Sequence, residues 1–504
     1  MNIKQAKEEI KHTVLAYLSK DSYGAYKIPA IRQRPMLLIG PPGIGKTQIM
    51  EQIAMECGIG LVAYTITHHT RQSAVGLPFI KEEVFDGEKK QVTEYTMSEI
   101  IASVYQKMER SGRREGILFI DEINCVSETL APTMLQFLQC KTFGNQAVPE
   151  GWIIVAAGNP PEYNKSVRDF DMVTLDRVRC MNIEADRKVW REYARERHVN
   201  PAILSYLELR PNNFYRVETD VDGLSFVTAR GWEDLSNLMD VYEELGLPLS
   251  EEVIHEFLHH KDVAEDVAAY FDLYKKYQDD YGIEEILHGR VKSSVYARIY
   301  EAAFDERLSV VNLLLSGLTN VFFEIQNEKQ ITDSWYGFLK NYRMALKNKD
   351  ISQNIFEQLL EEKEQQDEWN EKNHFVSKQE SNREKELNCR LRQQAREWKK
   401  KDAINIEETA LFEQARQPFE KQCEKLESLE NSGIAALNHA FDFMEHAFEN
   451  GSEMVVFVTE LTVTPEIAVF LSEHECEYYE RYKKQLLIGT KRSELLNELD
   501  RDGV

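Results

Sequence analysis

Short apolar runs alternate with amphipathic segments of helical period in the first half of the chain. The apolar runs, each of strand length, are Met36–Ile39, Ile59–Ile66, Ile117–Ile120 and Trp152–Ala157. The helical patterns between them are Gln48–Cys57, Ser98–Glu109 and Thr129–Gln139. Such alternation predicts βαβ units and a mostly parallel sheet, which is an α/β fold. Within it, Val84–Glu88 followed by Gln91–Tyr95 predicts a hairpin that turns at Asp86-Gly87.

The second half of the chain is helical in pattern. Twelve of the fourteen prolines lie at or before Pro248, and residues 338–432 contain no glycine. Amphipathic helices are predicted at Trp190–Arg197, Pro201–Leu209 and Trp232–Leu245, and a rather apolar helical stretch at about residues 300–345. Residues 350–430 are rich in Glu, Lys, Gln and Arg, which favours a solvated helical arm over a coiled coil. The apolar run Met454–Thr464 fits either a late strand or a buried helix.

Composition indicates a soluble protein of a reducing compartment. The 504 residues suffice for two to four domains, and mean hydropathy is −0.48. No run approaches the ~20 apolar residues of a membrane span, and the N-terminus lacks the apolar core of a signal peptide. Seven scattered cysteines suggest neither a disulfide framework nor a zinc knuckle. We therefore expect a cytoplasmic protein without a membrane partner.

The net charge of −24 is concentrated in the second half. Up to Pro248 the chain has 29 basic and 34 acidic residues, and the other 32 basic and 51 acidic residues follow it. Such a surface repels phosphate backbones, so we expect no general binding of nucleic acid.

The first candidate site is a glycine-rich loop between a predicted strand and a predicted helix. It reads Gly40, Pro41, Pro42, Gly43, Ile44, Gly45, Lys46 and Thr47, and fits G-x-x-x-x-G-K-[ST]. Glycines let backbone N–H groups close around phosphates, and the helix N-terminus adds partial positive charge. Lys46 would reach the β- and γ-phosphates, while the Thr47 hydroxyl would ligate Mg²⁺. ATP and Mg²⁺ are thus the expected cofactors.

Two further strands are predicted to end in polar side chains. The run Ile117–Ile120 ends in Asp121-Glu122, at the strand edge where ligands of open α/β sheets bind. Asp121 would hold Mg²⁺, and Glu122 would activate the attacking water. The run Trp152–Ala157 leads to Asn159, which could orient that water or contact the γ-phosphate. Because Asn before Pro also favours a plain turn, this alternative stays open for Asn159.

These motifs resemble those of the AAA+ ATPases, and within them the MoxR-like group with its McrB and midasin relatives. The resemblance covers about residues 25–275 and implies a P-loop core, which we place at 1–182, and a small helical lid at 183–275. The acidic composition and helical pattern of the rest predict a large, mainly helical C-terminal region at 276–504. In this family Gly40–Thr47 resembles Walker A, Asp121-Glu122 Walker B and Asn159 sensor 1. The hairpin at Asp86-Gly87 resembles the helix-2 insert of this clade, and Phe143–Val148 the hairpin before sensor 1.

The resemblance also implies two arginines that act on the transferred phosphoryl group. Leu175–Val178 resembles the segment with the arginine finger, which makes Arg177 the candidate that acts from a neighbouring subunit; Arg179 could compete for that role. Thr228–Trp232 resembles sensor 2, so Arg230 would act in its own subunit. A guanidinium stabilises the charge of a transferring phosphoryl group, although surface ion pairs are the common fate of arginine.

The resemblance implies an ATPase that forms a ring, with a hexamer as the expected size, and remodels protein complexes. Proteins with a von Willebrand factor A domain are the partners that the resemblance implies, or another protein client. Two alternatives stay open: a motor that translocates nucleic acid or acts in restriction, and a nucleotide-gated scaffold with little turnover. Thr65, Thr67 and His68 are three candidates for the residue that couples ligand state to Glu122.

A second motif points to different chemistry. His255-Glu256-Phe257-Leu258-His259 matches H-E-x-x-H, which on a helix can place two imidazoles on one face for zinc. The histidines lie beside an apolar stripe, toward the polar side, and no third ligand follows at the expected spacing. We therefore interpret this segment as a solvated helix face.

Overall fold

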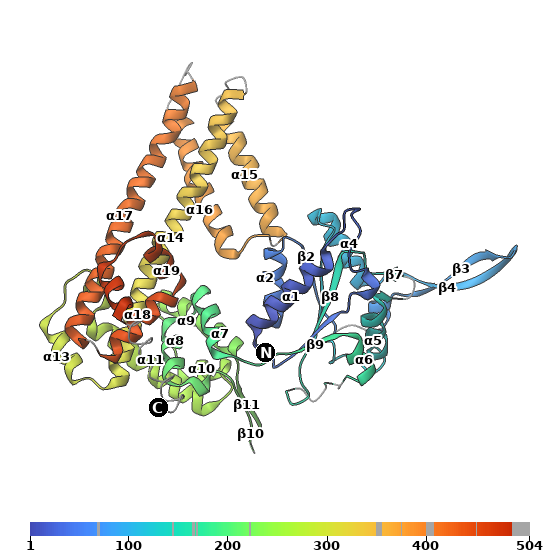
Figure 1. The fold of residues 1–504 in the computed structure, drawn as a ribbon, viewed down its shortest axis with the longest axis horizontal. Helices are drawn as coiled ribbons and strands as arrows, with labels where there is room; N and C mark the ends of the chain where they lie inside the picture. The colour runs from blue at the N-terminus through green and yellow to red at the C-terminus, as the bar shows by residue number, and fades with distance from the viewer. Residues whose placement is uncertain are drawn as a thin grey trace, which may run out of the picture. The chain divides into compact units, whose positions relative to one another are not determined.

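The computed structural model describes residues 1–67, 71–143, 146–163, 167, 170–220, 223–348, 355–373, 375–399, 408–449 and 451–485 (Figure 1). The chain divides into two compact units. Unit 1 is Met1–Arg191, Phe214–Asp234 and Lys372–Val376; unit 2 is Glu192–Asn213, Leu235–Glu371 and Ser377–Val504. The three-part division at residues 182 and 275 stays a prediction.

Unit 1 is built on a five-stranded parallel sheet with the order β2-β5-β8-β1-β9. The strands are β1 (Met36–Ile39), β2 (Gly60–Thr65), β5 (Gly116–Asp121), β8 (Trp152–Gly158) and β9 (Arg179–Asn182). The predicted α/β fold and its four strands are thus confirmed. The fifth strand, β9, was not predicted, because only Met181 of its four residues is buried and no apolar run marks it.

Alternating side chains of these strands form two cores, one on each face of the sheet. Leu37, Leu118 and Ile154 pack into one core, and Met36, Phe119 and Val155 into the other. Since successive side chains of a strand point to opposite faces, strands covered on both sides read as continuous apolar runs. This is why the runs, rather than alternation, marked the strands in the sequence.

Helices cover both faces of the sheet. The second core takes its helical side chains from α1 (Ile3–Leu18) and α2 (Lys46–Glu56), which lie side by side in Figure 1. The first core takes them from α3 (Arg71–Val75), α4 (Glu99–Ser111) and α5 (Ala131–Cys140). Other helices that belong wholly or largely to unit 1, or begin in it, are α6 (Met172–Arg177), α7 (Arg187–Glu196), α9 (Ala229–Leu245) and the short 3₁₀ helix Ala30–Arg32.

Three separate antiparallel hairpins complete unit 1. The hairpin of β3 (Pro78–Phe85) and β4 (Glu88–Tyr95) turns at Asp86-Gly87, as predicted. That of β6 (Thr142–Phe143) and β7 (Gln146–Ala147) confirms the second predicted hairpin. The third, β10 (Arg216–Asp220) with β11 (Gly223–Val227), falls where the sequence analysis expected helices only.

Unit 2 is helical in the part of the chain that the structure describes. Its helices include α8 (Pro201–Leu209), a 3₁₀ turn (Pro211–Asn213), α10 (Glu251–Phe257), α11 (Lys261–Tyr281), α12 (Ile283–Leu287), α13 (Ser293–Glu301), α14 (Phe304–Asn348), α15 (Ile355–Lys372), α16 (Lys378–Lys399), α17 (Glu408–Phe448), α18 (Ser452–Val463) and α19 (Pro465–Glu473). The run Met454–Thr464, left open between strand and helix, belongs to α18 and is helical.

The helices expected at residues 350–430 are confirmed where the structure describes this range, but the expectation that they form a solvated arm was wrong. Side chains of α14, α15, α16 and α17 form a common core that includes Trp335, Phe356, Leu387 and Leu391. Figure 1 shows these long helices running together through unit 2. The helices α15 and α16 each contribute a narrow apolar stripe within a strongly polar sequence, and their packing against the more apolar α14 hides these apolar side chains.

One helix of the described residues is long and apolar enough to cross a membrane. It is Phe304–Lys347, with a mean hydropathy of 1.6 over its most apolar window, half of which is buried. The pair Ser452–Val463 and Pro465–Glu473 passes only when taken together, across a bend of 82°. Val310, Leu314 and Leu318 of the long helix are fully buried inside the protein, so its role as a core helix accounts for its hydropathy.

Candidate active site

The glycine-rich loop joins the end of β1 to the start of α2 in unit 1. Gly43 and Gly45 have φ of 73° and 89°, in the left-handed region that favours glycine. Gly40 runs so close to the backbone that an added Cβ would lie 2.7 Å from the carbonyl oxygen of Ile183. The path of this loop therefore depends on the glycines that the motif requires.

The N-terminus of α2 presents backbone N–H groups without a side-chain cap. Its N-cap is Gly45, and the first turn holds no acidic residue. The first N–H groups of a helix have no partner within the helix, and together with the helix dipole they favour an anion. This helix end thus fits a phosphate group.

Lys46 is a buried cation whose hydrogen-bond partners are uncharged. Its Nζ donates to the carbonyl oxygens of Gly40 and Pro41 and to Oδ1 of Asn159, each at 2.8 Å. Burial lowers the pKa of Lys46 to about 8, against the opposing effect of the Asp121 carboxylate. A buried ammonium without a bonded anion is costly, and a phosphate oxygen would supply the missing charge.

Thr47 and Asp121 form the neighbouring pair. The Thr47 Oγ1 donates to Oδ2 of Asp121 at 2.9 Å, which joins the start of α2 to the end of β5. Hydroxyl and carboxylate oxygens are the ligands that Mg²⁺ takes beside nucleotide phosphates. These two residues fit the predicted metal site.

Glu122 follows in a strained conformation. Its φ of 56° lies in the left-handed region, and its backbone N–H donates to Oδ1 of Asp121 at 2.9 Å. Non-glycine residues in this region cost about 1–3 kcal/mol and cluster at functional sites. The turn places the half-buried Glu122 directly beyond the metal-site carboxylate.

Asn159 is held by a residue that the sequence analysis missed. Asn124 Nδ2 donates to the carbonyl oxygen of Asn159 at 2.8 Å, and the Asn159 N–H donates to Asn124 Oδ1 at 3.3 Å. An added Cβ on Gly158 would lie 2.5 Å from that Oδ1. This reciprocal pair leaves the Asn159 side chain directed to Lys46, which a plain turn would not require. No local pattern in the sequence marks Asn124, because its partner lies 35 residues further along the chain.

Arg230 lies at the same loop. A Cβ added to Gly43 would lie 3.2 Å from the side chain of Thr228 and 3.3 Å from Cβ of Arg230, and the Arg230 charge contributes to the lowered pKa of Lys46. The structure therefore brings together the loop, Asp121, Glu122, Asn159 and Arg230.

The two candidate finger arginines have different partners. Arg177, at the exposed end of α6, donates to the side chain of Gln139 on α5. Arg179 on β9 is bound to α1, through Thr13 at 2.5 Å and an ion pair with Glu9. Among the described interactions, neither arginine bonds to residues 40–47 of its own chain.

The three candidates for coupling to Glu122 are placed unequally. Thr65 is the register partner of Asp121 in the β2–β5 pair, and its side chain is exposed. Thr67 is half-buried, and His68 lies outside the described residues.

The H-E-x-x-H segment is interrupted. α10 ends at Phe257, so His255 and His259 do not share a helix, and the described residues contain no cluster of three metal-ligating side chains. The two histidines therefore do not lie on one helix face, which is the geometry that zinc binding by this motif requires.

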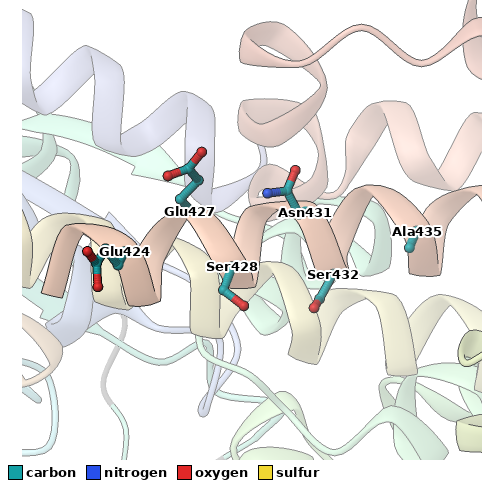
Figure 2. A pocket seen from close by; sticks show the side chains of 6 residues that line it. All are labelled: Glu424, Glu427, Ser428, Asn431, Ser432 and Ala435. Carbon is teal, nitrogen blue, oxygen red and sulfur yellow. The ribbon is translucent and has the colours of Figure 1, made fainter. Parts of the chain in front are cut away.

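Figure 2 shows a shallow hollow in unit 2 along α17. It is lined by Glu424, Glu427, Ser428, Asn431, Ser432 and Ala435. Its two carboxylates would repel phosphates, and no basic side chain lines it. It is not a nucleotide site.

Comparison with known families adds one finding. Residues 36–173 match the family described as ATPase family associated with various cellular activities (AAA). The matched region contains the loop, Asp121, Glu122 and Asn159, and ends before Arg177 and Arg230. No curated protein matches the chain. The match supports an ATPase domain of the AAA+ type, over residues 36–173.

Proposed function

We propose that the protein is a ring-forming AAA+ ATPase of the MoxR-like group that hydrolyses ATP to remodel protein complexes. The observation that carries the ATPase proposal is the buried Lys46, bonded to three neutral oxygens beside the Thr47–Asp121 pair. These residues fit a nucleotide phosphate and its metal ion.

The residues divide the work by their chemistry. Backbone N–H groups of the loop and Lys46 would bind phosphate oxygens, and Thr47 and Asp121 would hold Mg²⁺. When bound, ATP would supply the transferable phosphoryl group, and Mg²⁺ would offset part of the charge of that group. Glu122 would accept the proton of the attacking water, while Asn159 would orient that water. Arg230, from its place beside Gly43, would stabilise the charge on the phosphoryl oxygens.

Glu122→Gln tests this assignment. The amide keeps the size of the side chain but cannot accept the proton, so we expect normal ATP affinity by calorimetry and turnover at least ~100-fold slower. A variant with activity near wild type would show that another base acts. Wild-type protein that binds no ATP with Mg²⁺ would overturn the proposed function itself.

The ring is supported by the surface around Arg177. The same short helix exposes Met172 by 85% and Val173 by 55%, apolar side chains that a neighbouring copy could cover. Beside them, Arg177 at the exposed end of α6 could complete the site of the adjacent subunit. Residues 36–173 belong to a kind of domain that typically assembles in rings, and a hexamer is our proposal for the size.

Mixing two inactive variants tests the arginine finger. Arg177→Ala should keep its ATP affinity and lose ~10³–10⁵ in turnover, the range for such fingers. Adding Lys46→Ala subunits should restore activity, since an Arg177→Ala subunit keeps a sound loop and can use Arg177 of its neighbour. Restoration should fail when the Arg177→Ala partner also carries Glu122→Gln. Full activity of Arg177→Ala alone would refute the role and turn the test to Arg179.

The client is proposed to be a protein, for example one with a von Willebrand factor A domain, in the cytoplasm. The net charge of −24 supports a protein client over nucleic acid. Purification with the Glu122→Gln variant, which should hold its client in the ATP state, would identify it. ATP turnover stimulated by DNA would instead favour the motor, and turnover near zero under all conditions would favour the scaffold.

A further inference from the structure

The sequence analysis did not predict the hairpin of β10 and β11. The residues at the open end of this hairpin contact the glycine-rich loop. The hairpin register pairs Arg216 with Val227, so the residues just outside it, Tyr215 and Thr228, face each other across the two strands. Both lie in the part of unit 1 contributed by Phe214–Asp234. The antiparallel pairing thus delivers two side chains to one place.

Those two residues lie against a single peptide group of the loop, the one that joins Pro42 to Gly43. The Tyr215 hydroxyl donates to the carbonyl oxygen of Pro42 at 2.9 Å. Thr228 lies 3.2 Å from where a Cβ of Gly43 would be, so it leaves little room for any residue larger than glycine at position 43. Burial raises the pKa of Tyr215, which keeps its hydroxyl protonated and a donor at neutral pH.

The hydrogen bond to the Pro42 carbonyl oxygen also sets the direction of the Gly43 N–H, which belongs to the same peptide group. The described chain has no cis peptide bond, and in a planar trans peptide the C=O and N–H point in opposite directions. With the Pro42 oxygen bound to Tyr215, the Gly43 N–H must point away from Tyr215.

The Gly43 N–H is also the first donor that the loop can offer. Pro41 and Pro42 have no N–H, and the Gly40 N–H already donates to the carbonyl oxygen of Gly158 at 3.3 Å. The orientation of the peptide Pro42–Gly43 therefore decides whether the loop begins with a usable donor.

The anchor of Tyr215 is itself rigid. The carbonyl of the preceding residue, Phe214, accepts a hydrogen bond from Nε1 of the fully buried Trp232 at 3.1 Å. The Phe214 ring packs on Trp190, with 5.1 Å between ring centroids. A side chain fixed in this way can impose its geometry on the loop instead of following it.

We propose that Tyr215 is a positioning residue of the nucleotide site, which orients the Gly43 N–H toward the phosphates through the Pro42 carbonyl. This inference rests on the proposed ATP binding. It makes the β10–β11 hairpin a separate part of the phosphate site, encoded more than 170 residues after the loop that it holds.

Tyr215→Phe tests it, because the ring stays and only the hydroxyl is lost. We expect ATP and ADP to bind about 2–13-fold more weakly, which corresponds to the loss of one hydrogen bond of about 0.5–1.5 kcal/mol. Turnover at saturating ATP should stay within about twofold, since the groups of the chemical step are intact. Thermal stability should fall no more than in a variant that loses a comparable hydrogen bond elsewhere in unit 1.

Tyr26→Phe is the matched control. Its hydroxyl also makes a 2.9 Å hydrogen bond in unit 1, to Glu115, away from the loop. Unchanged nucleotide affinity in Tyr215→Phe, or an equal loss in Tyr26→Phe, would overturn the inference. Wild-type protein that binds no ATP would instead refute the proposed function, so the two failures are distinct.

Discussion

Two buried charges, one in each unit, are bound in opposite ways. Lys46 in unit 1 is 8% exposed and donates only to neutral oxygens. Glu328 in unit 2 is 6% exposed, and Arg390 binds both of its oxygens, at 2.8 and 2.9 Å. Lys425 at 2.6 Å and Gln422 at 2.7 Å complete the partners of Glu328.

The pKa values of the two groups reflect that difference. Burial lowers the pKa of Lys46 to about 8, which disfavours its charge. The hydrogen bond from Arg390, the largest cause, lowers the pKa of Glu328 to about 2, which favours its charge despite burial. A buried ion that is hydrogen-bonded to its counter-charges belongs to the fold, whereas a buried ion that is hydrogen-bonded only to neutral groups indicates where an anionic ligand belongs.

The largest effect is expected for ATP binding when Lys46 becomes Met. Two charge-assisted bonds to phosphate, at about 1.5–3 kcal/mol each, would be lost, so affinity should fall by ~100-fold or more in calorimetry. The free energy of unfolding should change by less than about 1 kcal/mol, because the cost of burying the charge also disappears.

Lys141→Met is the control for that change. Burial lowers the pKa of Lys141 to about 8 as well, and its Nζ donates to the carbonyl oxygen of Ala30 at 2.6 Å, outside the loop. ATP affinity should survive this substitution. If Lys46→Met instead destabilised the protein and kept ATP binding, Lys46 would serve the fold as Glu328 does, and the contrast drawn between Lys46 and Glu328 would be wrong.

The next effect concerns Arg390→Met in unit 2. Glu328 would stay buried with its strongest partner gone, which should cost about 3 kcal/mol, the low end for a broken buried pair, since Lys425 and Gln422 remain. Urea unfolding would measure it, with ATP affinity unchanged. Arg392→Met is the comparison: Arg392 is 57% exposed in its ion pair with Glu364, so we expect at most about 1 kcal/mol. Equal losses in the two variants would contradict the buried network.

The two units also differ in which of their structural features could be predicted from the sequence. In unit 1 four of the five sheet strands, β1, β2, β5 and β8, coincide with compact apolar runs, and the loop, Asp121 and Asn159 follow directly from strand ends. The parts that sequence could not reveal depend on distant residues: Asn124 on the turn after β5, and Tyr215 on a hairpin whose register sets its position. Neither contact has a local signature.

In unit 2 the feature that the sequence analysis did not predict was the hydrophobic core shared by α14, α15, α16 and α17. Leu387, Leu391 and Ala395 of α16 recur at every fourth residue, and all are buried. Such a stripe is too narrow to stand out among the charged residues around it, and its meaning depends on three other helices that supply the rest of the core. Helix existence was predictable, but helix partners were not.

The smallest effect is the pH dependence of ATP binding. The pKa of Lys46 is about 8 in the free protein, and a bound phosphate should raise it, because the anion favours the ammonium. Below about pH 8 the lysine is already charged, so affinity should not depend on its proton. Above about pH 8 binding must take up a proton, and affinity should fall by about tenfold per pH unit until the pKa of the bound state is reached. Calorimetry in two buffers of different ionisation enthalpy would measure that uptake, which Lys141→Met should leave intact; affinity that is flat from pH 7 to 9.5 would mean that Lys46 already has its counter-charge.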